Sequence, residues 1–314
     1  MRLVATAGNP VPDGAVTGEV TTRDGAALRF ARWDAESRSR GAVCLLQGRA
    51  EFIEKYFETV RELKSRGFAV VTFDWRGQGL SARALTDPRK GHVESFRQYD
   101  ADLEAVMAEV VLPHHRRPLI ALAHSMGGAL ALRSAASGRG FFDRIILTAP
   151  MIGLPSLASS AFAGSTFRAM RAWGLGGAYI PGGRGTPMDL RPFAGNPRTS
   201  DPERYARNAG IVAAAPSLGL GSPTVAWVDA AFEALRELAE PGTPGKIREP
   251  MLIVTAGQDR IVSPAASALF ASRSVAASLL TIVGARHEVL MERNDFRQHF
   301  WSAFDSFCRL TTTP

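Results

Sequence analysis

The chain has 314 residues, of which 46% are hydrophobic and 21% are charged. These values are typical of a globular protein and exclude disordered and fibrous classes. The net charge is +7, but the arginines are scattered, so no nucleic-acid partner is expected. A solvated basic surface is the default interpretation of this charge, and contact with anionic lipid is the alternative.

The sequence contains no uninterrupted apolar run of about 20 residues that would span a bilayer. The first residues also lack the apolar region of a signal peptide, so we expect a cytoplasmic protein. Cys44 and Cys308 fall in separate predicted elements, and no disulfide is expected between them.

The first predicted element is a β-hairpin, because residues 22–25 have the composition of a tight turn between two extended segments. Six apolar runs follow, near residues 42–46, 69–74, 118–123, 144–149, 250–256 and 278–283. Longer amphipathic segments separate them, which predicts a mostly parallel sheet flanked by helices. Asp74 and Arg76 close the second run in a Gly-rich turn and are expected to be structural, because their motif contains no base.

The third run leads into Ala123-His124-Ser125-Met126-Gly127, which precedes a helix-forming segment of small residues. A strand-to-helix turn that exposes a serine Oγ is so tight that it needs small residues two positions before and after the serine. Ala123 and Gly127 meet that need. The pattern predicts a nucleophile elbow with Ser125 as the nucleophile, and the alternative is that Ser125 only caps a buried helix.

Residues 151–221 interrupt the alternation with clusters of Gly and Pro. We interpret this segment as a helical cap inserted after the sixth strand, so that residues 1–150 and 222–314 form one core. Four apolar side chains of the cap fall within one face of a helix and are candidates for binding an acyl chain: Phe162, Phe167, Met170 and Trp173. The alternative is that this face packs on the core.

The last two runs each end in a residue that can assist a serine nucleophile. Asp259 follows a glycine turn after the run 250–256, and His287 follows the run 278–283. Parallel strands bring such residues to one edge of the sheet, and the order Ser, Asp, His is that of a triad on this kind of sheet. We therefore predict that Ser125, His287 and Asp259 form a catalytic triad.

An oxyanion hole needs two N–H donors near the attacked carbonyl oxygen. Met126 follows the nucleophile and is one candidate. The other should lie in the loop after an earlier strand, where Gly48 permits a close backbone approach and Arg49 follows it. The backbone N–H groups of Arg49 and Met126 are therefore the predicted donors.

Several motifs together resemble the bacterial lysophospholipase and monoglyceride lipase branch of the α/β-hydrolases, which includes sequences of the serine aminopeptidase S33 type. They are QGRAEFIEKY (47–56), FDWRGQGLS (73–81), GHVESF (91–96), HSMGG (124–128) and GARHE (284–288). The resemblance implies the α/β-hydrolase fold and a serine hydrolase that cleaves carboxylic esters of single-chain lipids.

The expected reaction is ester hydrolysis through an acyl-enzyme, which requires no cofactor and no metal. The same triad serves a general carboxylesterase, a thioesterase or an amidase, and these alternatives stay open at the level of sequence. A third possibility is a receptor that uses the hydrolase fold to bind a small ligand without turnover.

Overall fold

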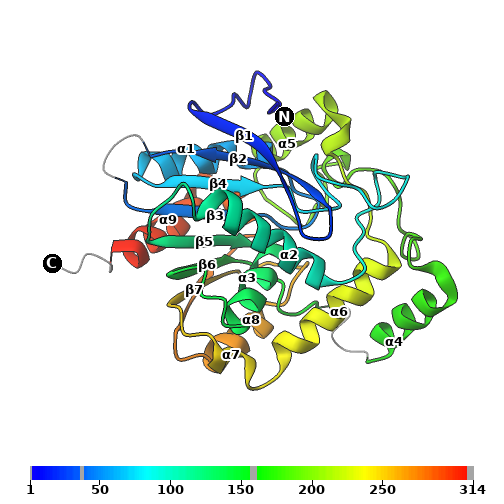
Figure 1. The fold of residues 1–314 in the computed structure, drawn as a ribbon. Coiled ribbons are helices and arrows are strands. Elements are labelled where there is room, and N and C mark those ends of the chain that lie inside the picture. The colour runs from blue at the N-terminus through cyan, green and yellow to red at the C-terminus, as the bar shows by residue number, and fades with distance from the viewer. Residues whose placement is uncertain (1, 36–38, 156–160, 310–314) are drawn as a thin grey trace.

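The computed structural model describes residues 2–35, 39–155 and 161–309, except for the side chains of residues 161–163 and 309. Within these residues, eight strands form one sheet in the spatial order β1-β2-β4-β3-β5-β6-β7-β8 (Figure 1). The strands are β1 (Ala15–Thr21), β2 (Ala27–Trp33), β3 (Ala42–Leu46), β4 (Ala69–Phe73), β5 (Leu119–His124), β6 (Arg144–Thr148), β7 (Met251–Ala256) and β8 (Ala277–Ile282).

The sheet begins with the expected antiparallel hairpin. β1 pairs with β2, β2 pairs antiparallel with β4, and every later neighbour is parallel. Strands β3, β4, β5 and β7 are buried along their whole length, as apolar strands covered on both faces must be. The prediction of a mostly parallel sheet is therefore confirmed.

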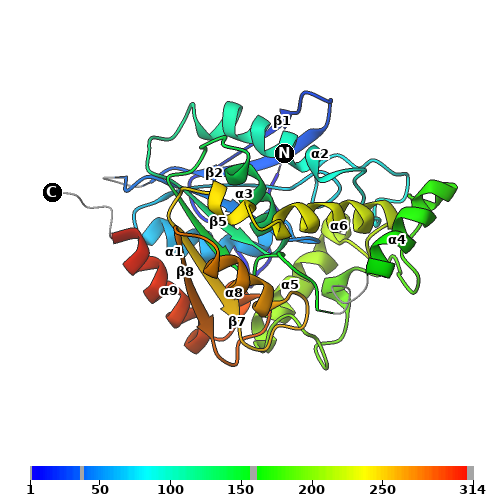
Figure 2. The same ribbon diagram turned by 90° about the horizontal axis from the view of Figure 1, so that it is seen from below.

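Helices cover both faces of this sheet (Figures 1 and 2). On one face, α1 (Phe57–Ser65) and α9 (Asn294–Arg309) bury side chains such as Phe57 and Phe304 against the strands. The other face carries α2 (Phe96–Val106), α3 (Met126–Ala136), α6 (Val225–Ala239) and α8 (Pro264–Ser272). The short α7 (Thr243–Lys246) follows α6. The sheet thus lies between two layers of helices.

Between β6 and α6 the chain leaves the sheet. The helical elements there are α4 (Ala161–Met170), α5 (Pro202–Ala214) and shorter turns at Arg171–Leu175, Met188–Leu190 and Pro216–Leu218. α4 lies beside α6 at the edge of the molecule in both views, and Phe167 stacks on Phe232 with ring centroids 6.2 Å apart. α5 packs Ile211 and Val212 against Phe52. The division into a core and a cap at residues 151–221 stays a prediction.

Buried ion pairs join the turn after β4 to its neighbours. The guanidinium of Arg29 lies 2.6 Å from Asp74 and 2.7 Å from Glu54, and all three side chains are fully buried. Asp74 also accepts a hydrogen bond from the N–H of Ile53, at 3.0 Å. These contacts agree with the structural role expected for Asp74, and they anchor the segment that follows β3.

Among the residues that the structure describes, no helix has the length and apolarity that a bilayer crossing requires. Cys44 and Cys308 are both buried.

Candidate active site

Ser125 occupies a strained turn between β5 and α3. Its backbone has φ 50° and ψ −115°, a conformation that costs a non-glycine residue about 1–3 kcal/mol. Backbone hydrogen bonds stabilise the turn. The Ser125 N–H donates to the Thr148 carbonyl oxygen at 3.1 Å, and the Ser125 carbonyl oxygen accepts from the Met151 N–H at 2.9 Å. The Ser125 side chain makes no capping bond to α3, so its hydroxyl is available for other contacts.

The glycine after the serine is required by close packing. A Cβ on Gly127 would lie 2.3 Å from the carbonyl oxygen of Leu46, well inside contact distance. The end of β3 and the start of α3 can therefore approach each other only because residue 127 has no side chain. This explains the small residue two positions after Ser125.

Ser125, His287 and Asp259 form a continuous hydrogen-bonded chain. Ser125 Oγ lies 3.0 Å from His287 Nε2, and His287 Nδ1 lies 2.7 Å from Asp259 Oδ2. The side chain of Asp259 is fully buried, and that of His287 is 5% exposed. The structure thus brings together the three residues that the sequence places at the ends of β5, β7 and β8.

Two backbone amides fix the carboxylate of Asp259. Its Oδ1 accepts from the N–H of Ile261 at 2.7 Å and from that of Val262 at 3.0 Å. Burial alone would raise the pKa of Asp259, but the hydrogen bond from His287 and these two amides outweigh burial and hold the pKa below its usual value. Asp259 is therefore ionised at neutral pH with Oδ2 directed at the imidazole.

A second histidine lies against this chain without joining it. His124 and His287 have ring centroids 4.8 Å apart, and His124 Nδ1 lies 3.0 Å from the Thr148 carbonyl oxygen. Burial lowers the pKa of His124 to about 4, so this imidazole is neutral at pH 7. His124 therefore places no positive charge beside the Ser125–His287 pair at this pH.

The loop after β3 passes directly beside Ser125. A Cβ on Gly48 would lie 3.2 Å from the Ser125 Cβ. Gln78 holds this loop, because its amide nitrogen donates to the Gly48 carbonyl at 2.8 Å and its amide oxygen accepts from the Ala50 N–H at 3.2 Å. In the described part of the chain, the N–H of Arg49 donates no hydrogen bond.

Met126 is the first residue of α3, so its N–H has no partner within the helix. The two predicted oxyanion donors, Arg49 and Met126, therefore lie on the two segments that meet at Ser125.

A cavity of about 200 Å³ opens beside Ser125 and His287. Its apolar lining comes from Met151, Leu154, Met188, Trp227, Ile261 and Val262. Its charged lining comes from Arg49, Glu51, Lys55, Arg198 and Glu288. An apolar region next to a few convergent polar groups is the usual character of a small-ligand site.

The apolar residues predicted to bind an acyl chain lie elsewhere. Phe167 stacks on α6, Met170 is half-buried, and Trp173 is 82% exposed. Of the side chains that the structure describes, none of these three lines the cavity beside Ser125. The side chain of Phe162 lies outside the described residues. The physical reason is that α4 packs along the outer side of α6.

Sequence reasoning missed a buried charge network in the cavity wall. Lys55 Nζ lies 2.7 Å from Glu51 and 2.9 Å from Glu288, and Arg198 lies 2.6 Å from Asp189. Burial alone would raise the pKa of Glu51, but Lys55 lowers it to about 2. Glu288 directly follows His287, and this adjacency is the sequence feature that could have indicated a charged group beside the site. Arg198 comes from the irregular segment between β6 and α6.

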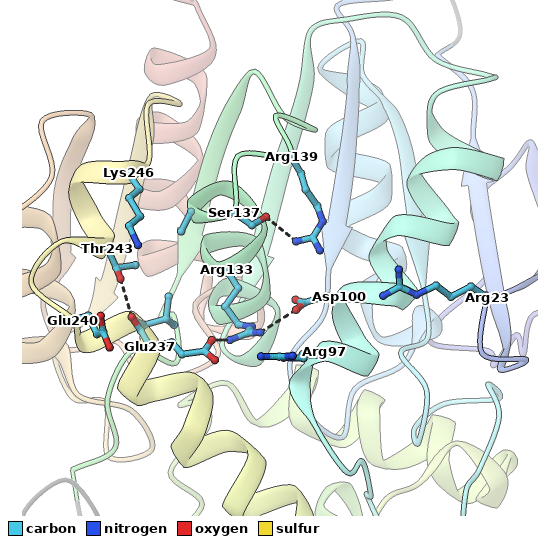
Figure 3. A pocket seen from close by; sticks show the side chains of 12 residues that line it. Arg23, Arg97, Asp100, Arg133, Ser137, Arg139, Glu237, Glu240, Thr243 and Lys246 are labelled. Carbon is cyan, nitrogen blue, oxygen red and sulfur yellow. Dashed lines mark hydrogen bonds and ion pairs between the residues drawn. The ribbon is translucent and has the colours of Figure 1, made fainter.

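A larger cavity of about 510 Å³ lies against α2, α3 and α6, away from Ser125 (Figure 3). Arg133 lies between the carboxylates of Asp100 and Glu237, with Asp100 at 2.9 Å. Arg139 donates to the hydroxyl of Ser137 at 2.7 Å. Its described lining contains no histidine or cysteine, and three of its arginines, Arg23, Arg133 and Arg139, already lie within ion-pair distance of carboxylates. The site beside Ser125 is therefore the candidate active site.

Known proteins match this chain over most of its length. The family described as serine aminopeptidase, S33, matches residues 37–294. Lysophospholipase L2 of Escherichia coli (strain K12) is 33% identical over 309 residues, covering 94% of this chain and 88% of the relative. A probable lysophospholipase L2 of Haemophilus influenzae is 30% identical, covering 87% of this chain and 85% of the relative.

Solved structures show the same fold. A soluble variant of monoglyceride lipase from Saccharomyces cerevisiae, in complex with a substrate analog, has a TM-score of 0.74 at 22% identity and covers 95% of this chain and 97% of its own. A thermostable carboxyl esterase from Bacillus coagulans has a TM-score of 0.76 at 16% identity, with 95% and 99% covered. The chain therefore belongs to the serine aminopeptidase S33 family of α/β-hydrolases, in the branch of lysophospholipases and monoglyceride lipases.

Proposed function

We propose that this protein is a serine hydrolase that cleaves carboxylic esters of single-chain lipids, as a lysophospholipase or monoacylglycerol lipase does. The observation that carries the proposal is the hydrogen-bonded chain from Ser125 Oγ through His287 to Asp259 at a strained strand-to-helix turn. The names of the relatives support the substrate class, and the apolar wall of the adjacent cavity fits an acyl chain.

In the proposed reaction, Ser125 Oγ attacks the ester carbonyl carbon while His287 Nε2 accepts the hydroxyl proton. The carbonyl oxygen becomes an oxyanion and accepts hydrogen bonds from the N–H groups of Arg49 and Met126. When the ester C–O bond breaks, His287 returns the proton to the leaving alcohol. His287 then takes a proton from water, which attacks the acyl-enzyme and releases the fatty acid and Ser125.

Asp259 has a positioning and electrostatic role in this mechanism. Its hydrogen bond to Nδ1 keeps the proton of the neutral imidazole on that nitrogen, so that Nε2 is free to accept the serine proton. Its negative charge then stabilises the imidazolium that forms. No step requires a cofactor or a metal.

We also propose transient contact between the enzyme and anionic membrane surfaces. Trp173 is 82% exposed and Leu175 is 43% exposed on the same helical turn, and the exposed Arg168 lies on the preceding helix. Exposed aromatic and aliphatic groups beside a cation favour the interfacial region of an anionic bilayer. Trp173→Ala should weaken cosedimentation with phosphatidylglycerol vesicles, and unchanged cosedimentation would count against this contact.

A cytoplasmic location is part of the same proposal, and the free thiol of Cys44 supports it, because thiols persist in reducing compartments. Fractionation of cells that express the untagged chain tests it directly. Recovery in the cytosol or weakly on membranes is expected, and recovery in an exported fraction would overturn it.

A fluorophosphonate probe tests the central proposal. Wild-type protein should be labelled and Ser125→Ala should not, while both fold with the same circular dichroism spectrum. The wild type is then assayed against lysophospholipids, monoacylglycerols and short p-nitrophenyl esters, with thioester and amide analogues alongside. Labelling of both proteins, or of neither, would remove the basis for catalysis by Ser125, and ligand binding without turnover would indicate a receptor.

A further inference from the structure

The cavity beside Ser125 contains three cationic side chains, and two of them are already neutralised. Lys55 lies 2.7 Å from Glu51 and 2.9 Å from Glu288. Arg198 lies 2.6 Å from Asp189. These cations need no further anion, because each has a buried carboxylate within hydrogen-bond distance.

Arg49 differs, because every partner of its guanidinium in the described structure is neutral. Nη2 donates to the Gly221 carbonyl at 2.9 Å, and Nη1 contacts the sulfur of Met188 at 3.6 Å. The guanidinium carbon lies 5.2 Å from the centre of the Trp227 ring. The Nε atom is buried without a hydrogen-bond partner.

Among the described residues, no carboxylate forms an ion pair with Arg49. Burial is the main reason why the pKa of Arg49 is lowered to about 10; the nearby charge of Arg191 acts in the same direction, and Tyr99 and Tyr179 oppose it. The side chain still carries its full charge at pH 7. A cation held in a cavity without an anion is destabilising, and an anionic ligand would relieve that cost.

The chain provides room for the guanidinium. A Cβ on Gly91 would lie 2.7 Å from Arg49 Nη2, so the absence of a side chain at residue 91 allows the guanidinium to lie where it does. Met188 and Trp227, which flank it, also line the cavity beside Ser125. The guanidinium therefore faces the same space as the nucleophile, on the loop whose backbone passes Ser125.

We propose that the Arg49 side chain binds the phosphate of a lysophospholipid head group and so makes the enzyme prefer phosphate-bearing esters to neutral monoacylglycerols. This inference rests on the proposed function, because it assumes that the ester carbonyl lies at Ser125. A guanidinium matches the geometry of two phosphate oxygens, and such charge-assisted bonds are strong in a dry site.

The arrangement gives residue 49 two separate contacts with one substrate. Its backbone N–H faces the ester carbonyl oxygen, and its side chain reaches the phosphate, with only the glycerol unit of the lipid between the two groups. Met151, Leu154, Ile261 and Val262 then remain to contact the acyl chain. A monoacylglycerol offers the guanidinium only hydroxyl groups, which leave its charge uncompensated.

The test compares esters that share one acyl chain: octanoyl lysophosphatidylcholine, octanoylglycerol and p-nitrophenyl octanoate, all below their micellar concentrations. In the wild type, kcat/KM should be higher for the lysophospholipid than for octanoylglycerol. Arg49→Met should lower the ratio of these two values by about 10- to 100-fold, the range for losing charge-assisted hydrogen bonds. Arg49→Lys should keep part of the preference, because it retains the charge but not the planar pair of donors.

Two further variants make the test specific. Gly91→Ala should lower the same ratio, because the new Cβ displaces the guanidinium. Arg97→Met removes an equal charge from the separate cavity of Figure 3 and should leave the ratio unchanged. Glycerophosphocholine should inhibit hydrolysis of p-nitrophenyl octanoate by the wild type more strongly than by Arg49→Met.

The outcomes separate two failures. If wild-type protein does not hydrolyse p-nitrophenyl octanoate and is not labelled by a fluorophosphonate, the proposed function itself fails. If the wild-type protein is active and labelled, but Arg49→Met slows the hydrolysis of all three esters equally, the Arg49 side chain does not distinguish head groups and the inference is overturned. Inhibition by inorganic phosphate with an unchanged substrate ratio would also overturn it, by indicating a site for the free anion.

Discussion

Asp259→Asn should abolish most of the activity while leaving the fold intact. The Oδ1 atom of Asp259 accepts from the amides of Ile261 and Val262, so the carbonyl oxygen of an asparagine must face those two donors. Its NH₂ group is then directed at His287 Nδ1, which lies 2.7 Å from Oδ2 in the native protein. An N–H facing Nδ1 forces that nitrogen to act as an acceptor, and the ring proton moves to Nε2.

In that tautomer His287 donates to Ser125 Oγ and can no longer take its proton. The corresponding change in a serine protease lowers kcat by about 10⁴-fold, which is about 5.5 kcal/mol of transition-state stabilisation. We expect a loss of that size for p-nitrophenyl butyrate at pH 7.5, with KM little changed. The thermal midpoint should stay close to that of the wild type, because both backbone amides keep their acceptor.

Asp259→Ala is the matched control, because it removes the same charge without fixing the tautomer. If the asparagine acts by holding the wrong tautomer, the alanine variant should be the more active of the two. A loss of less than about 10-fold for Asp259→Asn would refute the assignment of Asp259. Equal activity of the two variants would refute the tautomer argument and leave the carboxylate charge as the cause.

Three further predictions concern stability. Lys55→Met leaves the buried carboxylates of Glu51 and Glu288 without their cation, so urea denaturation should show that the free energy of unfolding falls by about 3–5 kcal/mol. A decrease below about 1 kcal/mol would contradict the role of Lys55 in this network. Burial alone would raise the pKa of Glu51, but Lys55 lowers this pKa from 4.5 to about 2. The contribution of the Glu51 carboxylate to stability is therefore complete above pH 4.5 and is lost as the pH falls through about 2. Glu51→Gln should flatten the dependence of stability on pH in that window, as measured by denaturation at each pH. Gly127→Ala places a Cβ 2.3 Å from the Leu46 carbonyl oxygen and should cost about 1–3 kcal/mol or more, which an unchanged melting temperature would disprove.

The sheet could be predicted from the sequence because its parallel strands are buried on both faces and therefore appear as short apolar runs. The run 69–74, for example, corresponds to β4 at Ala69–Phe73. The residues of the proposed triad could be located for a related reason. Each follows one of these runs within four residues, and the carboxyl ends of parallel strands meet at one edge.

The walls of the cavity could not be predicted in the same way. Helical periodicity grouped Phe167, Met170 and Trp173 on one face, but periodicity does not say which neighbour that face meets. In the structure Phe167 meets Phe232, while Met188 and Arg198 reach the cavity from a stretch without regular periodicity. Trp227 belongs to α6, and its contact with Arg49 depends on how that helix crosses the loop after β3.

Because of the position of β8, catalytic activity should respond to warming or mild denaturant differently from the global stability of the fold. In the described sheet β8 is an edge strand that pairs only with β7, and His287 lies in the turn that follows it. Edge strands open in local fluctuations that need less free energy than global unfolding. Fraying of β8 would carry the imidazole away from Ser125 while β3 to β6 stay intact. The rate of ester hydrolysis should therefore fall, on warming or in mild denaturant, before the loss of bulk secondary structure, and would serve as a local reporter of that edge.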